Sequence, residues 1–85
     1  MDPNRLTGKN ILITGAARGM GEANARAFAA QGANVCLADL DGDQAQTVAD
    51  DINSAGHGKA IAVHCDVTKR EDNAAAVAAT VEAFG

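Results

Sequence analysis

The chain has 85 residues, a net charge of −4 and 47% hydrophobic residues, which is enough apolar content for one small packed domain. The acidic balance argues against nucleic acid and anionic membranes as partners, and no apolar run reaches the roughly 20 residues of a membrane span. The N-terminus lacks the apolar segment of a secretory signal, and Cys36 and Cys65 lie within apolar runs, which favours buried, reduced thiols in a cytoplasmic protein over a disulfide.

The first half of the chain is predicted to form a strand, a helix and a second strand. Residues 9–14 are an apolar strand segment, and the alanine-rich segment 19–31 is a helix that Gly32 ends. A second apolar run over 33–39 has the length of a strand. The tail before residue 8 has no such pattern, so we expect it to be loosely held.

The second half continues the alternation. Asp43 is placed to cap a helix over about 44–55, and a third strand is predicted over 59–65. Thr68 and Glu71 have the spacing of a capping box, which predicts the start of a third helix. The apolar face predicted for this helix consists of Ala74, Val77, Ala78, Val81 and Phe84.

The strand segments are continuous apolar runs rather than alternating ones. Such runs are typical of strands that helices cover on both faces, which indicates a parallel sheet. Right-handed crossovers then place the first two helices on one face and order the strands 3-2-1. The sequence therefore predicts an α/β fold with the element order β-α-β-α-β-α.

Three glycines stand where the first predicted strand meets the first predicted helix. Gly15 allows a sharp turn off the strand, Gly19 leaves room for a ligand beside the main chain, and Gly21 allows close packing of the helix on the strand. The unpaired N–H groups and the dipole at such a helix start attract an anion, typically a pyrophosphate. A turn of this kind predicts a nucleotide-binding site.

Asp39, at the end of the second predicted strand, supports this interpretation. A carboxylate at this position can accept hydrogen bonds from both ribose hydroxyls of an adenosine. On its own Asp39 fits equally well as a solvated turn residue beside Asp41 and Asp43. The glycine turn favours the ribose role.

These motifs resemble those of the short-chain dehydrogenase/reductase family. The segment "TGAARGMG" matches the family's Thr-Gly-x3-Gly-x-Gly turn, and the similarity continues through "VCLADLD" and "CDVT" to "VEAFG". The resemblance implies an incomplete Rossmann-like domain over 1–85, without the strands and helices that follow the third helix in the family. Asn24 is a local departure, since it shares a predicted helix face with Met20 and Phe28 and would need a polar partner there.

The resemblance also implies NAD as the cofactor and names the residues that contact it. They are Gly15, Arg18, Gly19, Met20 and Gly21 at the pyrophosphate turn, Asp39 at the ribose, and Leu40, Asp66 and Val67 around the adenine. From the residues alone, the alternative for Arg18 is a solvated loop charge, and the alternative for Asp66 is a turn residue near Thr68 that precedes the third helix. Asp39 favours NAD over NADP, because its carboxylate would repel a 2′-phosphate, while Arg18 acts in the opposite direction.

The chain departs from the family at the catalytic group. That group contains a Ser and a Tyr followed four residues later by Lys, and this chain has no tyrosine. Ser54, His57 and His64 are better interpreted as structural or surface residues, and no Cys/His cluster has the spacing of a zinc site. We therefore expect no catalytic residue and no activity of the chain alone.

Two functions from different classes remain open from the sequence. The first is the NAD-binding portion of an oxidoreductase that transfers hydride between NAD and an alcohol or ketone. The second is a stand-alone nucleotide-binding or interaction domain without catalysis. The resemblance further implies a homo-oligomeric whole protein and a fourth strand beside the first, so the strand at 9–14 is expected to have an open edge.

Overall fold

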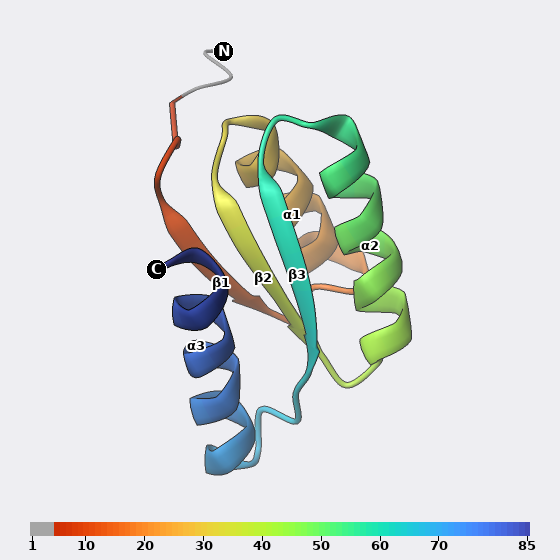
Figure 1. Ribbon diagram of the computed structural model, residues 1–85. Coiled ribbons are helices and arrows are strands. Elements are labelled where there is room, and N and C mark those ends of the chain that lie inside the picture. The colour runs from red at the N-terminus through yellow and green to blue at the C-terminus, as the bar shows by residue number, and fades with distance from the viewer. Residues whose placement is uncertain (1–4) are drawn as a thin grey trace.

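The computed structural model describes residues 5–85 and contains three strands that alternate with three helices (Figure 1). The elements are β1 (Asn10–Thr14), α1 (Gly19–Ala30), β2 (Asn34–Asp39), α2 (Gly42–Ala55), β3 (Lys59–His64) and α3 (Arg70–Phe84). The strands are parallel and lie in the order β1-β2-β3. The predicted element order, sheet order and fold class are confirmed, and every strand boundary lies within one residue of its predicted place.

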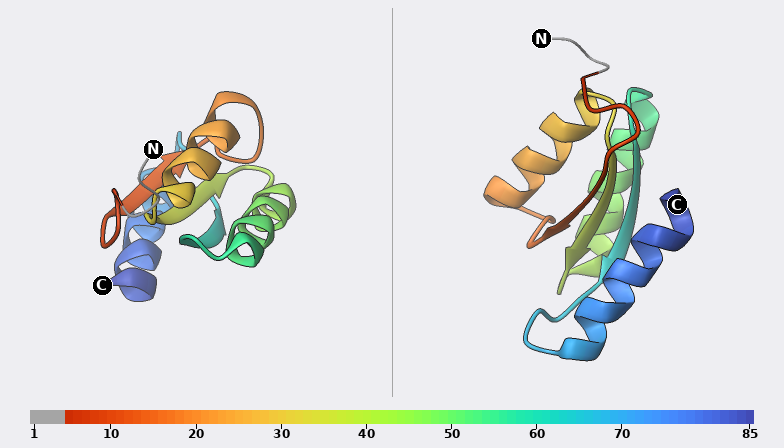
Figure 2. Two further views of the ribbon diagram at one scale, coloured as in Figure 1. Left: turned by 90° about the horizontal axis from the view of Figure 1, so that it is seen from above. Right: turned by 90° about the vertical axis from the view of Figure 1, so that its left-hand side faces the viewer.

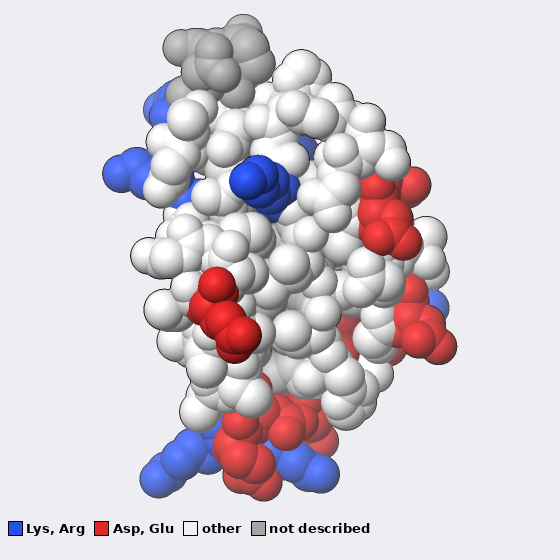
Figure 3. All heavy atoms as spheres, in the orientation of Figure 1, with Lys and Arg blue, Asp and Glu red and all other residues white. Residues whose placement is uncertain are grey.

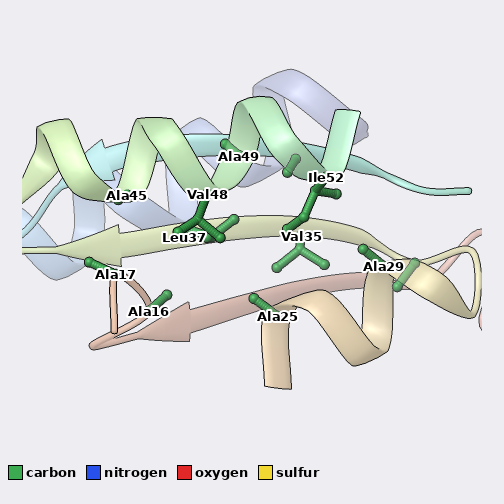
Figure 4. Close-up of a cluster of buried hydrophobic side chains, with 12 residues drawn as sticks. Ala16, Ala17, Ala25, Ala29, Val35, Leu37, Ala45, Val48, Ala49 and Ile52 are labelled. Atoms are coloured by element: carbon green, nitrogen blue, oxygen red, sulfur yellow. The ribbon is translucent and has the colours of Figure 1, made fainter. Parts of the chain in front are cut away.

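The helices form two layers around the sheet. Figure 2 shows α1 and α2 on one face and α3 on the other, as right-handed crossovers require. Along β2, Val35 and Leu37 point toward α1 and α2 because alternate residues of a strand face opposite sides. In the close-up of Figure 4, Val48 and Ile52 of α2 lie over these two side chains. This larger core fixes the sheet against α1 and α2.

The smaller core lies between the sheet and α3, and it corrects the predicted face of that helix. Ala76 and Thr80 of α3 are buried, whereas Val77 and Val81 are 53% and 60% exposed. The Thr80 hydroxyl donates to the Ala76 carbonyl oxygen at 2.8 Å, which makes its burial tolerable. Alanine and valine occur almost all round this helix, so the sequence gives little directional signal. Contacts with the sheet decide which face is buried.

The start of α2 also differs from the prediction. Asp41 rather than Asp43 is the N-cap residue, and its carboxylate accepts a hydrogen bond from the Gln44 N–H at 3.0 Å. The helix therefore begins at Gly42, two residues before its predicted start. Asp43 lies in the first turn, where its charge is still favourable near the helix N-terminus.

The predicted capping box at the start of α3 is wrong. The N-cap residue is Lys69, which makes no side-chain capping hydrogen bond. Thr68 instead donates its hydroxyl to Asp66 Oδ1 at 2.7 Å, so this hydroxyl serves the preceding turn rather than the helix. A local Asx turn has replaced the cap that the spacing of Thr68 and Glu71 suggested.

Two expectations about local structure are also corrected. Residues 1–4 lie outside the described part of the chain, but Leu6 is held by a hydrogen bond from its N–H to the Gln31 carbonyl oxygen at 2.7 Å and packs against the larger core. Asn24 is exposed rather than near the core, so it needs no buried partner. None of the helices within residues 5–85 is long and apolar enough to cross a membrane.

The two outer strands differ in how their edges are protected. On β3, the Asn53 side chain accepts from the Ala60 N–H at 2.8 Å and donates to the Ala60 carbonyl oxygen at 2.9 Å. The Lys59 N–H points the other way, to the Ala33 carbonyl oxygen, so Asn53 covers the edge away from β2. Within residues 5–85, β1 pairs with β2 alone, which leaves the edge of Ile11, Leu12 and Ile13 open as expected.

We expect the purified 85-residue chain to self-associate and to be marginally stable. An apolar edge strand with free N–H and C=O groups is a template for pairing with another chain. Size-exclusion chromatography with light scattering over a range of concentrations, and thermal melts with and without millimolar NAD, measure both properties. A clean monomer with a cooperative transition above about 60 °C would contradict this prediction.

Candidate functional site

The carboxyl ends of the three strands bring the predicted site residues to one edge of the sheet. Parallel strands end on the same side, and the register aligns Thr14 with Ala38 and Asp39 with His64. A hollow opens there, which we call the edge hollow. It is lined by Gly15, Asp39, Leu40, Cys65 and Val67. Segments far apart in the sequence thus form the walls of one site.

The three glycines of the turn are needed for two different reasons. Gly15 and Gly19 have φ angles of 64° and 61°, a left-handed conformation that side chains other than glycine rarely adopt. A Cβ built on either would meet nothing within 4 Å, so the space beside them is open. A Cβ on Gly21 would overlap the Gly15 carbonyl oxygen. Gly21 is therefore required by the close approach of α1 to the end of β1.

The start of α1 follows directly on the glycine turn. Its N-cap residue, Arg18, makes no side-chain capping hydrogen bond. The preceding loop is fixed by the fully buried Ala16 and Ala17, and the Ala16 N–H donates to the Ala38 carbonyl oxygen at 3.3 Å. A helix start without a side-chain cap, beside a glycine turn, is suited to an anion.

Asp39 holds this loop in place, a role that the sequence did not reveal. Its Oδ2 accepts from the Ala17 N–H at 3.1 Å, and its Oδ1 accepts from the Asp41 N–H at 2.8 Å. Asp39 is therefore not simply a solvated turn residue. A carboxylate has about four acceptor positions, so these two bonds leave capacity for hydroxyl groups of a ligand.

Arg18 is paired rather than free in solvent. Its Nη2 lies 2.7 Å from Asp41 Oδ2, and the two side chains are 67% and 40% exposed. The pKa of Asp41 lies below its usual value because the carboxylate accepts from the Gln44 N–H and pairs with Arg18. An exposed pair of this kind contributes little stability, but it links the glycine turn to the start of α2.

Leu40, Met20 and Val67 are exposed apolar residues around the site. They are 65%, 80% and 55% exposed, and Leu40 and Val67 are among the residues that line the edge hollow. Asp66 makes an Asx turn, in which its Oδ1 accepts from the Thr68 hydroxyl and from the Thr68 N–H at 3.0 Å. These bonds lower the pKa of Asp66.

The remaining candidate residues do not form a second site. Ser54, His57 and His64 are exposed, and within residues 5–85 no group of His, Cys, Asp and Glu could hold a metal ion. Cys36 and Cys65 are free and buried, as predicted, and burial raises the pKa of each thiol. Acidic side chains gather where β3 passes into α3, with basic side chains on either side of them (Figure 3).

A second hollow lies away from the glycine turn, between α1, α2 and the start of β3. Ala29, Ala30, Ile52 and Ala55 give it mostly apolar walls. Arg26 at its rim pairs with Glu22 at 2.8 Å and with Asp51 at 3.2 Å. The pair with Glu22 lies within α1, and the pair with Asp51 joins α1 to α2. The residues that line this hollow include no part of the glycine turn.

Comparison with known proteins identifies the family of the chain. A family model described as short chain dehydrogenase matches residues 9–85. Trans-4-hydroxycyclohexanecarboxylate dehydrogenase of Sinomonas cyclohexanicum is 47% identical over 87 residues, covering 96% of this chain and 34% of that protein. A 2,5-dichloro-2,5-cyclohexadiene-1,4-diol dehydrogenase of Sphingobium indicum is 48% identical over 82 residues, covering 96% of this chain and 32% of that protein.

Solved structures give the same result. A hydroxysteroid dehydrogenase from Escherichia coli superposes with a TM-score of 0.91 at 38% identity, covering 99% of this chain and 34% of that one. A short chain dehydrogenase/reductase from Burkholderia phymatum in complex with NAD superposes with a TM-score of 0.88 at 36% identity. The match covers 95% of this chain and 28% of that one. The chain thus spans about a third of the length of the proteins it matches. With its glycine turn, parallel sheet and family match, the chain belongs to the short-chain dehydrogenase/reductase family.

Proposed function

We propose that the edge hollow and the glycine turn bind the adenosine and pyrophosphate half of NAD. The observation that carries this proposal is the convergence of an uncapped helix start, an open glycine turn and the Asp39 carboxylate at one sheet edge. The residues fit such a ligand because no Cβ fills the space beside Gly15 and Gly19. An NAD complex of a family member with 36% identity supports the same cofactor.

Each proposed contact follows from the chemistry of its residue. The turn of Gly15, Gly19 and Gly21, with the backbone at Met20, would receive the pyrophosphate, and Arg18 would lie beside its adenosine side. Asp39 would accept hydrogen bonds from the adenosine ribose. The apolar side chains of Leu40 and Val67 would cover the adenine, whose polar edge would meet Asp66.

The whole protein is proposed to be an NAD-dependent oxidoreductase that acts on an alcohol or ketone. The nicotinamide supplies the hydride chemistry, and this chain binds and orients the opposite half of the cofactor. The relatives named as dehydrogenases of hydroxylated six-membered rings support a substrate of that class. The tyrosine that serves as proton donor in the family is not among these 85 residues. The alternative is a nucleotide-binding domain without catalysis.

A matched pair of glycine substitutions tests the proposed phosphate contact. Gly8 and Gly19 both have a left-handed conformation and open space around a built Cβ, but only Gly19 lies at the turn. We expect Gly19→Ala to weaken binding of NAD and of ADP-ribose about tenfold or more, because the new methyl group occupies the phosphate approach. Isothermal titration of the purified protein measures this change.

The control for this test is Gly8→Ala. Alanine should lower the stability by about 1–2 kcal/mol at either position, because both glycines have a left-handed backbone conformation. Gly8→Ala should nevertheless bind both ligands as the unaltered protein does. Equal affinities for the two variants would show that the turn does not receive the phosphates.

A further inference from the structure

The first turn of α3 reaches back to the loop that follows β3. Asp72 Oδ2 accepts from the Asp66 N–H at 2.9 Å. Asn73 donates from Nδ2 to the Val67 carbonyl oxygen at 3.0 Å, and its Oδ1 accepts from the Cys65 thiol at 3.6 Å. Two consecutive side chains of one helix therefore hold three consecutive residues of the loop.

The two contacts of Asn73 fall on the two loop residues that line the edge hollow. Cys65 and Val67 form its wall on the β3 side, while Asp66 between them points its carboxylate into the Asx turn. Val67 is 55% exposed, so packing alone does not fix its position. The Lys69 N–H donates to the Asp66 carbonyl oxygen, and Thr68 donates to the Asp66 carboxylate, so both contacts span Val67 without binding it. Asn73 adds a direct hydrogen bond to the Val67 carbonyl oxygen.

The Asp72 carboxylate accepts a hydrogen bond from the Asp66 N–H. The carboxylates of Asp72 and Asp66 therefore lie near one another. Their repulsion is offset by the N–H groups they accept from and by the positive end of the α3 dipole. Through this hydrogen bond Asp72 fixes the path of the loop backbone beside Asn73.

We propose that Asn73 is a positioning residue for the adenine end of the cofactor, supported by Asp72. The proposal rests on the proposed function of the edge hollow. By binding the Val67 carbonyl oxygen and the Cys65 thiol, Asn73 sets the distance between the Val67 wall and the Leu40 wall. Without it, the loop would widen or close the space that the adenine ring enters.

The test measures the affinity of the purified protein for ADP, which carries the adenine, the ribose and the pyrophosphate. We expect Asn73→Ala to raise the Kd for ADP about three- to tenfold, the range expected when one or two neutral hydrogen bonds are lost. Asn73→Asp keeps the acceptor for Cys65 but cannot donate to the Val67 carbonyl oxygen. It should weaken ADP binding as much as alanine does.

Asn53→Ala is the matched control. Asn53 makes the same kind of paired contact with a backbone, at Ala60 on the outer edge of β3, but it lies outside the edge hollow. It should lower the melting temperature by an amount similar to Asn73→Ala and leave the Kd for ADP unchanged. In the whole enzyme, Asn73→Ala should raise KM for NAD and leave kcat unaltered.

Each result bears on a different statement. If the unaltered protein binds ADP and both Asn73 variants bind it equally well, the positioning role is wrong and the proposed function stands. An equal loss of affinity in Asn53→Ala would also overturn the positioning role, because general destabilisation would then explain it. If the unaltered protein binds neither ADP nor NAD, the proposed function is wrong and the inference fails with it.

Discussion

Gly21→Ala is expected to destabilise the folded chain by about 3 kcal/mol or more, a large share of the stability of a small domain. A Cβ at this position would overlap the Gly15 carbonyl oxygen and would lie 3.1 Å from the Ala16 Cα. Both are backbone atoms of a loop that Asp39 and Ala38 hold by hydrogen bonds. The loop therefore cannot move aside without losing those bonds. Denaturant unfolding followed by circular dichroism measures the loss.

Gly42→Ala is the control for this prediction. Gly42 opens α2 as Gly19 opens α1, but a Cβ there would lie 3.4 Å from the His64 Cβ, which is close to an ordinary contact. Alanine is also the better helix former, so this variant should be as stable as the unaltered chain or slightly more so. If Gly21→Ala unfolded at the same denaturant concentration as Gly42→Ala, the close approach of α1 and β1 would not limit stability.

The second large effect concerns the choice between NAD and NADP. We expect the whole enzyme to prefer NAD, since the Asp39 carboxylate within about 4 Å of a 2′-phosphate would repel it by several kcal/mol at an effective dielectric constant of about 20. Asp39→Ala combined with Leu40→Arg should move the preference toward NADP. The ratio of kcat/KM with NAD to kcat/KM with NADP measures the preference of each enzyme. A clear NADP preference of the unaltered enzyme would refute the assignment.

The structure adds a cost to this switch. Removing the Asp39 carboxylate leaves the N–H of the fully buried Ala17 without its partner, which costs about 1–3 kcal/mol. The double variant should therefore be less stable than the unaltered enzyme, and its absolute kcat/KM should fall even as its preference changes.

Asp41→Asn separates the charge effect from this loss of stability. Asparagine still caps α2, but it no longer pairs with Arg18 as an anion. The freed guanidinium should produce a smaller shift toward NADP without loss of stability. If Asp41→Asn shifted the preference as far as the double variant does, Arg18 rather than Asp39 would be the main residue that discriminates between NAD and NADP.

The sequence predicted the fold because every element carries its own local signal. The strands at β1, β2 and β3 are uninterrupted apolar runs, and the glycines at 15, 19 and 32 mark turns that few other residues can make. The parallel arrangement and its handedness follow from strand twist and the length of the crossovers. These features are encoded within short windows, which explains why the boundaries lie within one or two residues of their predicted places.

The predictions that failed had two causes: contacts between segments distant in the sequence, and competition between neighbouring side chains. The buried face of α3 could not be predicted because its alanines and valines lie on all sides, and only the position of the sheet selected Ala76 and Thr80. The cap at Thr68 failed because Asp66 competed for the same hydroxyl. Similarly, the sequence indicated Asp39 as a ligand residue but not that its carboxylate holds the glycine loop.

The sequence by itself thus determined the order of elements, the parallel sheet and the presence of a glycine turn at a strand end, because propensity, turn chemistry and hydrophobic pattern act locally. Only the tertiary structure decided how the site is held together. The bonds from Asp39 to Ala17, from Asn73 to Val67 and between Arg18 and Asp41 join residues that no local pattern relates, and the Asp39 and Arg18 bonds span more than 20 positions. They form only when the strand ends meet at one edge of the sheet.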